Sequence, residues 1–86
     1  MSKRKVTVEE AQAIGARLGI NWSEIVLEQF RRGMEVEFEH GVCDPETNVT
    51  DDDPVVTGKI AWAHLKELPD YYTRLDAMEA EAEGKI

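Results

Sequence analysis

Helical periodicity, interrupted by glycine and proline, is the feature that most restricts the fold of this chain. Apolar residues recur every three or four positions in four stretches, and no stretch alternates between apolar and polar residues over the length of a strand. The chain also has no internal repeat. The pattern therefore predicts an all-α protein, a small single-domain bundle of about four helices.

Capping residues delimit the first two helices. A Thr-x-x-Glu capping box that starts at Thr7 predicts a first helix over residues 8–18. Asn21 or Ser23 can cap a second, longer helix over residues 23–40. A glycine directly follows each stretch, at the position where helices commonly end.

A long acidic loop should separate the second helix from the third. Residues 41–53 contain two turn formers and five acidic residues. Asp53 followed by Pro54 predicts a third helix, which should end near the next proline because proline disfavours helix in the residue before it. Asp70 then opens a fourth helix that continues to about residue 83.

Length and charge limit the class of protein. The 86 residues allow one domain, residues 1–86, with an ordered core over about residues 7–80 and ends that should fray. Eighteen acidic against ten basic residues give a net charge of −8. This charge opposes binding to nucleic acid or to an anionic membrane, and it favours cations or a basic partner.

The single cysteine, Cys43, allows no intrachain disulfide. Neither a signal-peptide pattern nor a long apolar run is present. These features predict a cytoplasmic protein that does not span a membrane.

Two helices each carry a histidine and a glutamate on the face that should enter the core. Glu37 and His40 are on the second helix, and His64 and Glu67 are on the third. An unpaired buried charge is costly, so these four side chains need partners. They can satisfy one another and the neighbouring tyrosines in a polar layer, bind a metal ion, or carry out acid–base chemistry.

A metal site would use both imidazoles and both carboxylates to hold Zn²⁺, Mn²⁺ or Fe²⁺. The reversed order of the second motif argues against a di-iron bundle, which needs two Glu-x-x-His motifs and two further glutamates. In a plain antiparallel hairpin, His64 would lie opposite Gly33 and roughly 15 Å from His40. A loop that carried the chain back would instead bring the two Glu/His pairs together, so both arrangements remain open.

Two weaker ligand patterns lie near the loop. The loop is similar to the first half of an EF-hand, but Val49 and Val55 occupy the positions of the glycine and the bidentate glutamate that an EF-hand needs. His40 and Cys43 could form half of a zinc site together with His64.

Residues 11–30 have the spacing of two short helices around a glycine turn, as in a helix-turn-helix, but the acidic charge argues against DNA binding.

Five segments resemble those of a known family: "EVEFEHG", "TNVT", "TGKIA", "AHL" and "PDYY". The family consists of small uncharacterised helical proteins, a domain of unknown function found in bacteria and bacteriophages. The resemblance spans roughly residues 15–80, and Cys43 and Trp62 depart from the family pattern. It implies a short α-helical protein and supplies no catalytic residues.

An exposed apolar pair is expected on the third helix, where Trp62 should point away from the core close to Val55. Exposed apolar side chains can mark a surface for a partner.

No nucleophile, oxyanion hole or cleft is indicated, so the sequence favours a protein that is not an enzyme. The leading hypothesis is a non-catalytic protein-association module that binds another protein or a second copy. A metal-binding domain is the alternative, followed by a small DNA-binding or catalytic domain.

Overall fold

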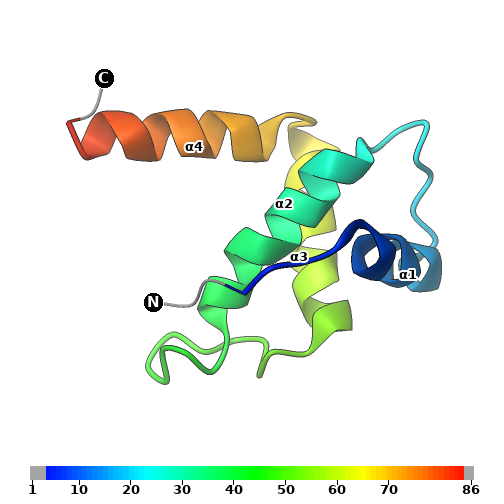
Figure 1. Ribbon diagram of the computed structural model, residues 1–86, viewed down its shortest axis with the longest axis horizontal. Helices are drawn as coiled ribbons and strands as arrows, with labels where there is room; N and C mark the ends of the chain where they lie inside the picture. The colour runs from blue at the N-terminus through cyan, green and yellow to red at the C-terminus, as the bar shows by residue number, and fades with distance from the viewer. Residues whose placement is uncertain (1–3, 85–86) are drawn as a thin grey trace.

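The computed structural model describes residues 4–84, which form four α-helices and one short 3-10 helix and contain no strand (Figure 1). The elements are α1 (Val8–Leu18), α2 (Leu27–Glu37), η1 (Phe38–His40), α3 (Pro54–Glu67) and α4 (Tyr71–Ala82). The all-α prediction is confirmed. The predicted fraying concerns in part residues 1–3 and 85–86, which lie outside the described residues. Among the described helices, none is long and apolar enough to cross a membrane.

α1 begins and ends as its capping signals predict. The Thr7 hydroxyl accepts a hydrogen bond from the Glu10 N–H at 3.0 Å, and the Glu10 carboxylate accepts one from the Thr7 N–H at 2.9 Å. The bond from Thr7 lowers the pKa of Glu10, because it stabilises the ionised carboxylate. Gly19 ends the helix with φ of 80°, a left-handed conformation that glycine adopts without steric cost.

α2 begins four residues later than predicted, at Leu27. The Asn21 side chain accepts bonds from the Ser23 N–H at 2.9 Å and the Ser23 hydroxyl at 2.7 Å, so it closes a local turn and caps no helix. Val26 occupies the N-cap position of α2 and provides no side-chain hydrogen bond. At its other end the helix narrows into η1, which carries it to His40 as the sequence indicates.

α3 and α4 start where the sequence predicts. The Asp53 carboxylate accepts hydrogen bonds from the N–H groups of Val55 and Val56, at 2.8 and 3.1 Å. Asp70 precedes α4 but caps no N–H group there, because its carboxylate accepts a hydrogen bond from Arg74 Nε at 2.8 Å. The pKa of Asp70 is lowered by that bond.

Residues 41–53 connect η1 with α3 through a series of turns. The N–H groups of Val49 and Thr50 donate to the His40 carbonyl, at 2.7 and 3.4 Å. The Asp52 carboxylate accepts a bond from the Val42 N–H at 3.1 Å, which ties the two ends of the loop together. Asp51 and Asp52 both have positive φ, 51° and 61°.

α2 and α3 run side by side in opposite directions, and α1 packs against both (Figure 1). α4 contacts α2 near its first turn and then extends beyond the other helices, along the 38 Å longest dimension of the molecule (Figure 1). The buried apolar side chains come from every helix and from the connecting segments: Val6, Ala11, Ile20, Ile25, Phe30, Met34, Phe38, Ala61, Leu65 and Tyr72.

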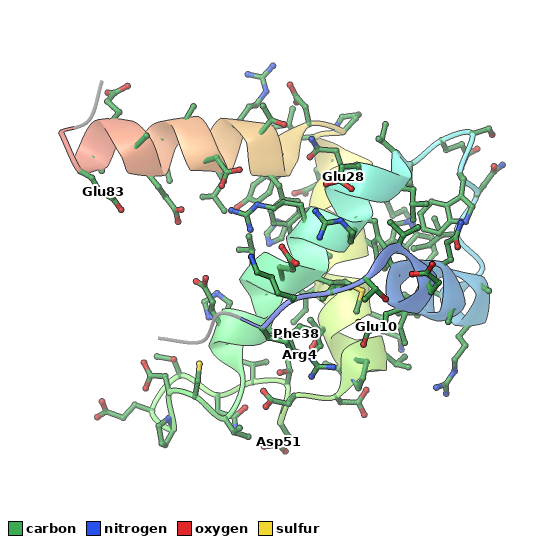
Figure 2. All side chains as sticks on the ribbon, in the orientation of Figure 1. Arg4, Glu10, Glu28, Phe38, Asp51 and Glu83 are labelled. Atoms are coloured by element: carbon green, nitrogen blue, oxygen red, sulfur yellow. The ribbon has the colours of Figure 1, made fainter. Side chains whose placement is uncertain are left out.

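The segment before α1 lies across α2. The Arg4 guanidinium lies 3.9 Å from the centroid of the Phe38 ring, and the two side chains meet below the middle of the molecule in Figure 2. The Val6 N–H donates to the Glu35 carboxylate at 2.9 Å, and Arg31 donates to the Val6 carbonyl at 3.0 Å. Two charged side chains of α2 therefore hold this segment in place.

The buried face of α3 differs from the predicted one. The sequence places His64 and Glu67 on that face, but the residues that are buried are Thr57, Gly58, Ala61 and Leu65. These are mostly small residues, which let α3 approach its neighbours closely but contribute little to an apolar pattern. Trp62, predicted to point away from the core, is half-buried and packs against it. The prediction of an exposed tryptophan is therefore wrong.

Candidate functional site

One carboxylate in this molecule is buried where three helices meet. Glu37, the last residue of α2, is 4% exposed, so its predicted inward position is confirmed. A carboxylate removed from water needs hydrogen bonds or positive charges around it. Its neighbours come from η1, α3 and α4.

Tyr72 supplies the hydrogen bond. Its hydroxyl donates to Glu37 Oε2 at 2.6 Å, and the residue is completely buried. Burial raises the pKa of Tyr72, and the bond to the Glu37 carboxylate raises it further, because both disfavour a phenolate. The Tyr72 ring lies against Gly33, where a Cβ atom would overlap the ring edge. The space beside Gly33, which a plain hairpin would give to His64, is thus occupied by Tyr72.

The imidazoles of His40 and His64 also lie near the Glu37 carboxylate. His64 Nε2 lies 3.7 Å from Glu37 Oε2, and His40 Nε2 lies 3.9 Å from Glu37 Oε1. Both distances exceed the range of a hydrogen bond. The His40 side chain is 55% exposed and that of His64 is 36% exposed, so solvent reaches both rings.

Aromatic packing sets the orientation of His64. Its ring stacks on Tyr71, with centroids 4.3 Å apart and planes 5° apart. Tyr71 in turn meets Tyr72 edge to face, with centroids 5.0 Å apart. The first turn of α4 therefore holds both the carboxylate of Glu37 and the imidazole of His64.

The structure brings together three of the four residues predicted as metal ligands. The imidazoles of His40 and His64 each lie near the Glu37 carboxylate, on different oxygens. α2 and α3 form an antiparallel hairpin, so the alternative in which a returning loop brings the C-terminal ends of both helices together is not the one found (Figure 1). Glu67 is exposed, and its side chain makes no ion pair or hydrogen bond with residues 4–84. The prediction that both His40 and Glu67 point into the core is wrong, because α2 changes to a 3-10 helix and the buried face of α3 is rotated. As the side chains lie, residues 4–84 contain no group of three or more His, Cys, Asp and Glu side chains that could hold a metal ion.

The two remaining predicted residues lie elsewhere. Val55 is half-buried at the start of α3. Trp62 has the Lys66 ammonium 4.8 Å above its ring and borders a shallow hollow with Ile25 and Pro69. They therefore do not form the exposed apolar pair that the sequence suggested.

A partly exposed apolar surface lies on α4 and the residues just before it. Leu68 and Met78 are 37% and 60% exposed, and half-buried Tyr71 and Leu75 lie between them. Together with Arg74 these side chains line a shallow groove. The periodicity of α4 was visible in the sequence, but nothing in it indicated that the helix would extend away from the core.

Comparison with known proteins gives one family. The model of a family described as "Protein of unknown function (DUF5661)" matches residues 11–81. Neither the curated proteins nor the solved structures include a match to this chain.

Proposed function

The chain belongs to the DUF5661 family of proteins of unknown function, and from that premise we propose that it is a protein-association domain in which α4 pairs with α4 of a second copy. The observation that carries the proposal is the exposed apolar stripe on a helix that extends beyond the rest of the molecule (Figure 1). An apolar helix face with no intramolecular cover is typical of an association surface.

The spacing of the stripe suits helix pairing. Tyr71, Leu75, Met78 and Ala82 recur at intervals of four, three and four residues, the seam of a coiled coil. In an antiparallel pair, Leu75 of one copy would pack against Met78 of the other, and Tyr71 against Ala82. The exposed Met78 side chain of each copy would enter the groove of the other, so one surface provides both halves of the interface.

Charges beside the stripe are self-complementary in that arrangement. Arg74 and Glu81 lie on the same flank of the stripe, seven residues apart. Antiparallel pairing would place Arg74 of each copy near Glu81 of the other. Glu81 makes no ion pair with the described residues, whereas Arg74 bonds Asp70 through an exposed contact that it can exchange at little cost.

The net charge of −8 opposes association of two copies at long range. Such repulsion between exposed charges is screened beyond about 8 Å at physiological ionic strength. Added salt should therefore strengthen pairing of two acidic copies. It would weaken the binding of a basic partner, so the salt dependence separates these two kinds of association.

Sedimentation equilibrium over a range of chain and salt concentrations tests the proposal. We expect a monomer–dimer equilibrium that Met78→Glu weakens more than roughly tenfold, because the substitution places a charge in the seam. Ala77→Glu, on an exposed part of the same helix away from the stripe, should leave the equilibrium nearly unchanged. Arg74→Glu should weaken pairing, and the exchange Arg74→Glu with Glu81→Arg should restore it.

A chain that stays monomeric at all concentrations would contradict the proposal. So would a dimer that Met78→Glu leaves intact. A dimer that dissociates as salt is added would contradict the screening argument and point to an interface between opposite charges.

A further inference from the structure

The leading segment, residues 4–6, runs across α2 without forming a helix or strand (Figure 1). We propose that the groove under it is a recognition site for an extended basic segment of a partner protein, with an arginine two residues before a large apolar side chain. The leading segment occupies this groove when no partner is bound. The site uses no residue of α4, so it is independent of the pairing proposed above.

Side chains of α2 bind the backbone of the leading segment. Glu35 accepts a hydrogen bond from the Val6 N–H at 2.9 Å, and Arg31 donates to the Val6 carbonyl at 3.0 Å. Arg31 also donates to Glu35 at 3.0 Å, so the acceptor and the donor hold each other in place. In the recognition of extended peptides, such main-chain bonds provide affinity for many sequences, and side-chain pockets select among them. The same two residues can therefore bind the backbone of another segment.

A cationic side chain has a defined place in the groove. The Arg4 guanidinium lies 3.9 Å from the centroid of the Phe38 ring and 3.9 Å from the Glu10 carboxylate (Figure 2). An aromatic face beside a carboxylate attracts an arginine or a lysine. The net charge of −8 attracts a basic segment at longer range. The groove is thus complementary in charge to a basic partner.

The apolar part of the groove is larger than the side chain that enters it. Val6 is 3% exposed, yet it borders a cavity of about 170 Å³. Apolar groups of α1, α2 and η1 line this cavity: Ala13, Ile14, Met34 and Phe38. An apolar cavity of about 150 Å³ is large enough to bind benzene. A leucine, isoleucine or phenylalanine in the place of Val6 would fill it better, so a partner segment can bind more tightly than the leading segment does.

Exchange of the two segments requires little rearrangement. Only residues before Thr7 must leave the groove, and the hydrogen bonds between Thr7 and Glu10 that start α1 can stay in place. The leading segment competes as an intramolecular ligand with an effective concentration of about 1 mM, the order expected for a short flexible connection. Changes at Val6 therefore alter the competitor without altering the groove.

A fluorescein-labelled peptide with the sequence of residues 2–8 and the change Val6→Leu tests the site by fluorescence anisotropy. We expect it to bind the Val6→Ala chain more than about tenfold more tightly than the Val6→Leu chain, because each buried methylene changes the strength of the competitor about fourfold. The parent chain should lie between the two. In NMR spectra the methyl signal of Met34 should shift as peptide is added. The Val6→Leu chain should also unfold at a higher urea concentration than the parent, since its side chain fills the cavity.

Matched controls keep the result specific. Val8→Ala, the same change at an exposed position, should leave the chain with the peptide affinity of the parent. In the Val6→Ala chain, Glu35→Gln should weaken peptide binding at least about threefold, because the peptide N–H loses a charged acceptor. Glu39→Gln removes the same charge from an exposed position on η1 and should not weaken binding. Met78→Glu should bind the peptide like the parent, which separates this site from the pairing of α4.

The inference is overturned if the peptide does not bind the Val6→Ala chain at concentrations up to about 1 mM, the effective concentration of the competitor. Equal affinity for the Val6→Ala and Val6→Leu chains would overturn it, because the peptide would then bind elsewhere. Equal binding of a peptide with the same residues in scrambled order would overturn it too, since net charge alone would explain the interaction. A Val6→Leu chain less stable than the parent would show that the cavity accepts no larger side chain. Circular dichroism shows whether the Val6→Ala chain folds, and if it does not, the parent and Val6→Leu chains provide the same comparison.

Discussion

At the scale of single residues, Glu37 shows how one buried charge joins several elements. Glu37 is the last residue of α2. Its carboxylate accepts a hydrogen bond from the Tyr72 hydroxyl of α4 and lies near the imidazoles of His40 in η1 and His64 in α3. Its inward position followed from helical periodicity alone. Its closest partner did not, because a contact between residues 35 positions apart depends on how the helices cross.

The bond between Tyr72 and Glu37 should contribute measurably to stability. Tyr72→Phe leaves a buried carboxylate without its donor, so we expect the free energy of unfolding to fall by about 1–3 kcal/mol. Urea denaturation followed by circular dichroism measures the change. Tyr71→Phe is the control, since the Tyr71 hydroxyl makes no hydrogen bond with the described residues. An equal loss in both variants would show that the bond itself contributes nothing.

Gly33 illustrates a close approach that opposes helix propensity. Alanine is a better helix former than glycine by about 1 kcal/mol, so propensity alone predicts that Gly33→Ala stabilises α2. A Cβ atom at this position would lie 2.9 Å from two atoms of the Tyr72 ring and would overlap a third. Because that ring is held by Glu37, we expect a net destabilisation of about 1–3 kcal/mol in the same denaturation assay. A more stable variant would mean that the ring moves aside freely.

At the scale of the elements, caps decide where the helices begin. α4 begins after Asp70 as predicted, although the Asp70 side chain caps no N–H group there. Two of the four helix starts follow from capping side chains that act as the sequence indicates, those of Thr7 and Asp53. The second start does not, because Asn21 bonds its own turn, and propensity cannot distinguish that use of an asparagine from a helix cap. The face of α3 was misjudged for a different reason. Small side chains such as Gly58 and Ala61 are buried by close helix packing, which only the assembled fold reveals.

Asp53 offers a direct measurement of one cap. Asp53→Ala should lower the free energy of unfolding by about 1 kcal/mol, because two N–H groups at the start of α3 lose their acceptor. Asp53→Asn keeps an acceptor oxygen and should cost much less. Thermal denaturation of the two variants at neutral pH gives the comparison. Equal losses would indicate that the charge, and not the hydrogen bond, is what α3 requires.

The capping box of α1 should make part of the stability depend on pH. The pKa of Glu10 is lowered in the folded chain, chiefly by its bond to Thr7, so the unfolded chain takes up this proton first as the pH falls. The contribution is present above the ordinary glutamate pKa, near 4.5, and is lost in more acidic solution. Urea midpoints measured from pH 6 to pH 3 should therefore fall less steeply for Glu10→Gln than for the parent chain.

Glu9 provides the control for that titration. Glu9→Gln removes the same charge from the same turn but leaves the bonds between Thr7 and Glu10 in place. Its acid dependence should stay close to that of the parent chain. A Glu9→Gln profile as flat as that of Glu10→Gln would assign the effect to the helix dipole instead of the capping box.

At the scale of the whole molecule, the protein consists of a three-helix body and one extending helix (Figure 1). The number of helices could be predicted from the sequence, because each helix has its own periodicity and boundaries. The direction of α4 could not be predicted, since the same apolar stripe would serve equally for a core or for an external partner. The candidate site could be predicted only in part. The sequence identified Glu37, His40 and His64 as candidate residues, but it could not show how they would lie relative to one another.

Local stability should follow this division. Beyond Leu75 the side chains of α4 are mostly exposed, so this part of the helix should open more easily than α2 or α3. We expect amide hydrogens of residues 78–82 in dilute protein to exchange faster than those near Phe30 and Leu65, as measured by NMR. Uniform protection along all helices of a monomeric sample would contradict this division.

The attachment of α4 also has a mechanical consequence. Beyond its aromatic contacts, the helix is attached through its first two turns, where Tyr72 binds Glu37, Gln29 binds Thr73 and Arg32 binds Asp76 at 2.7 Å. Its 12 residues form a rod about 18 Å long. A rotation of about ten degrees about the first residue of the helix would displace the far end by about 3 Å, the rise of two residues along a helix. Because α4 is attached near the Glu37 carboxylate, a small rearrangement at that carboxylate would produce a larger displacement of the exposed apolar stripe toward the far end of the helix.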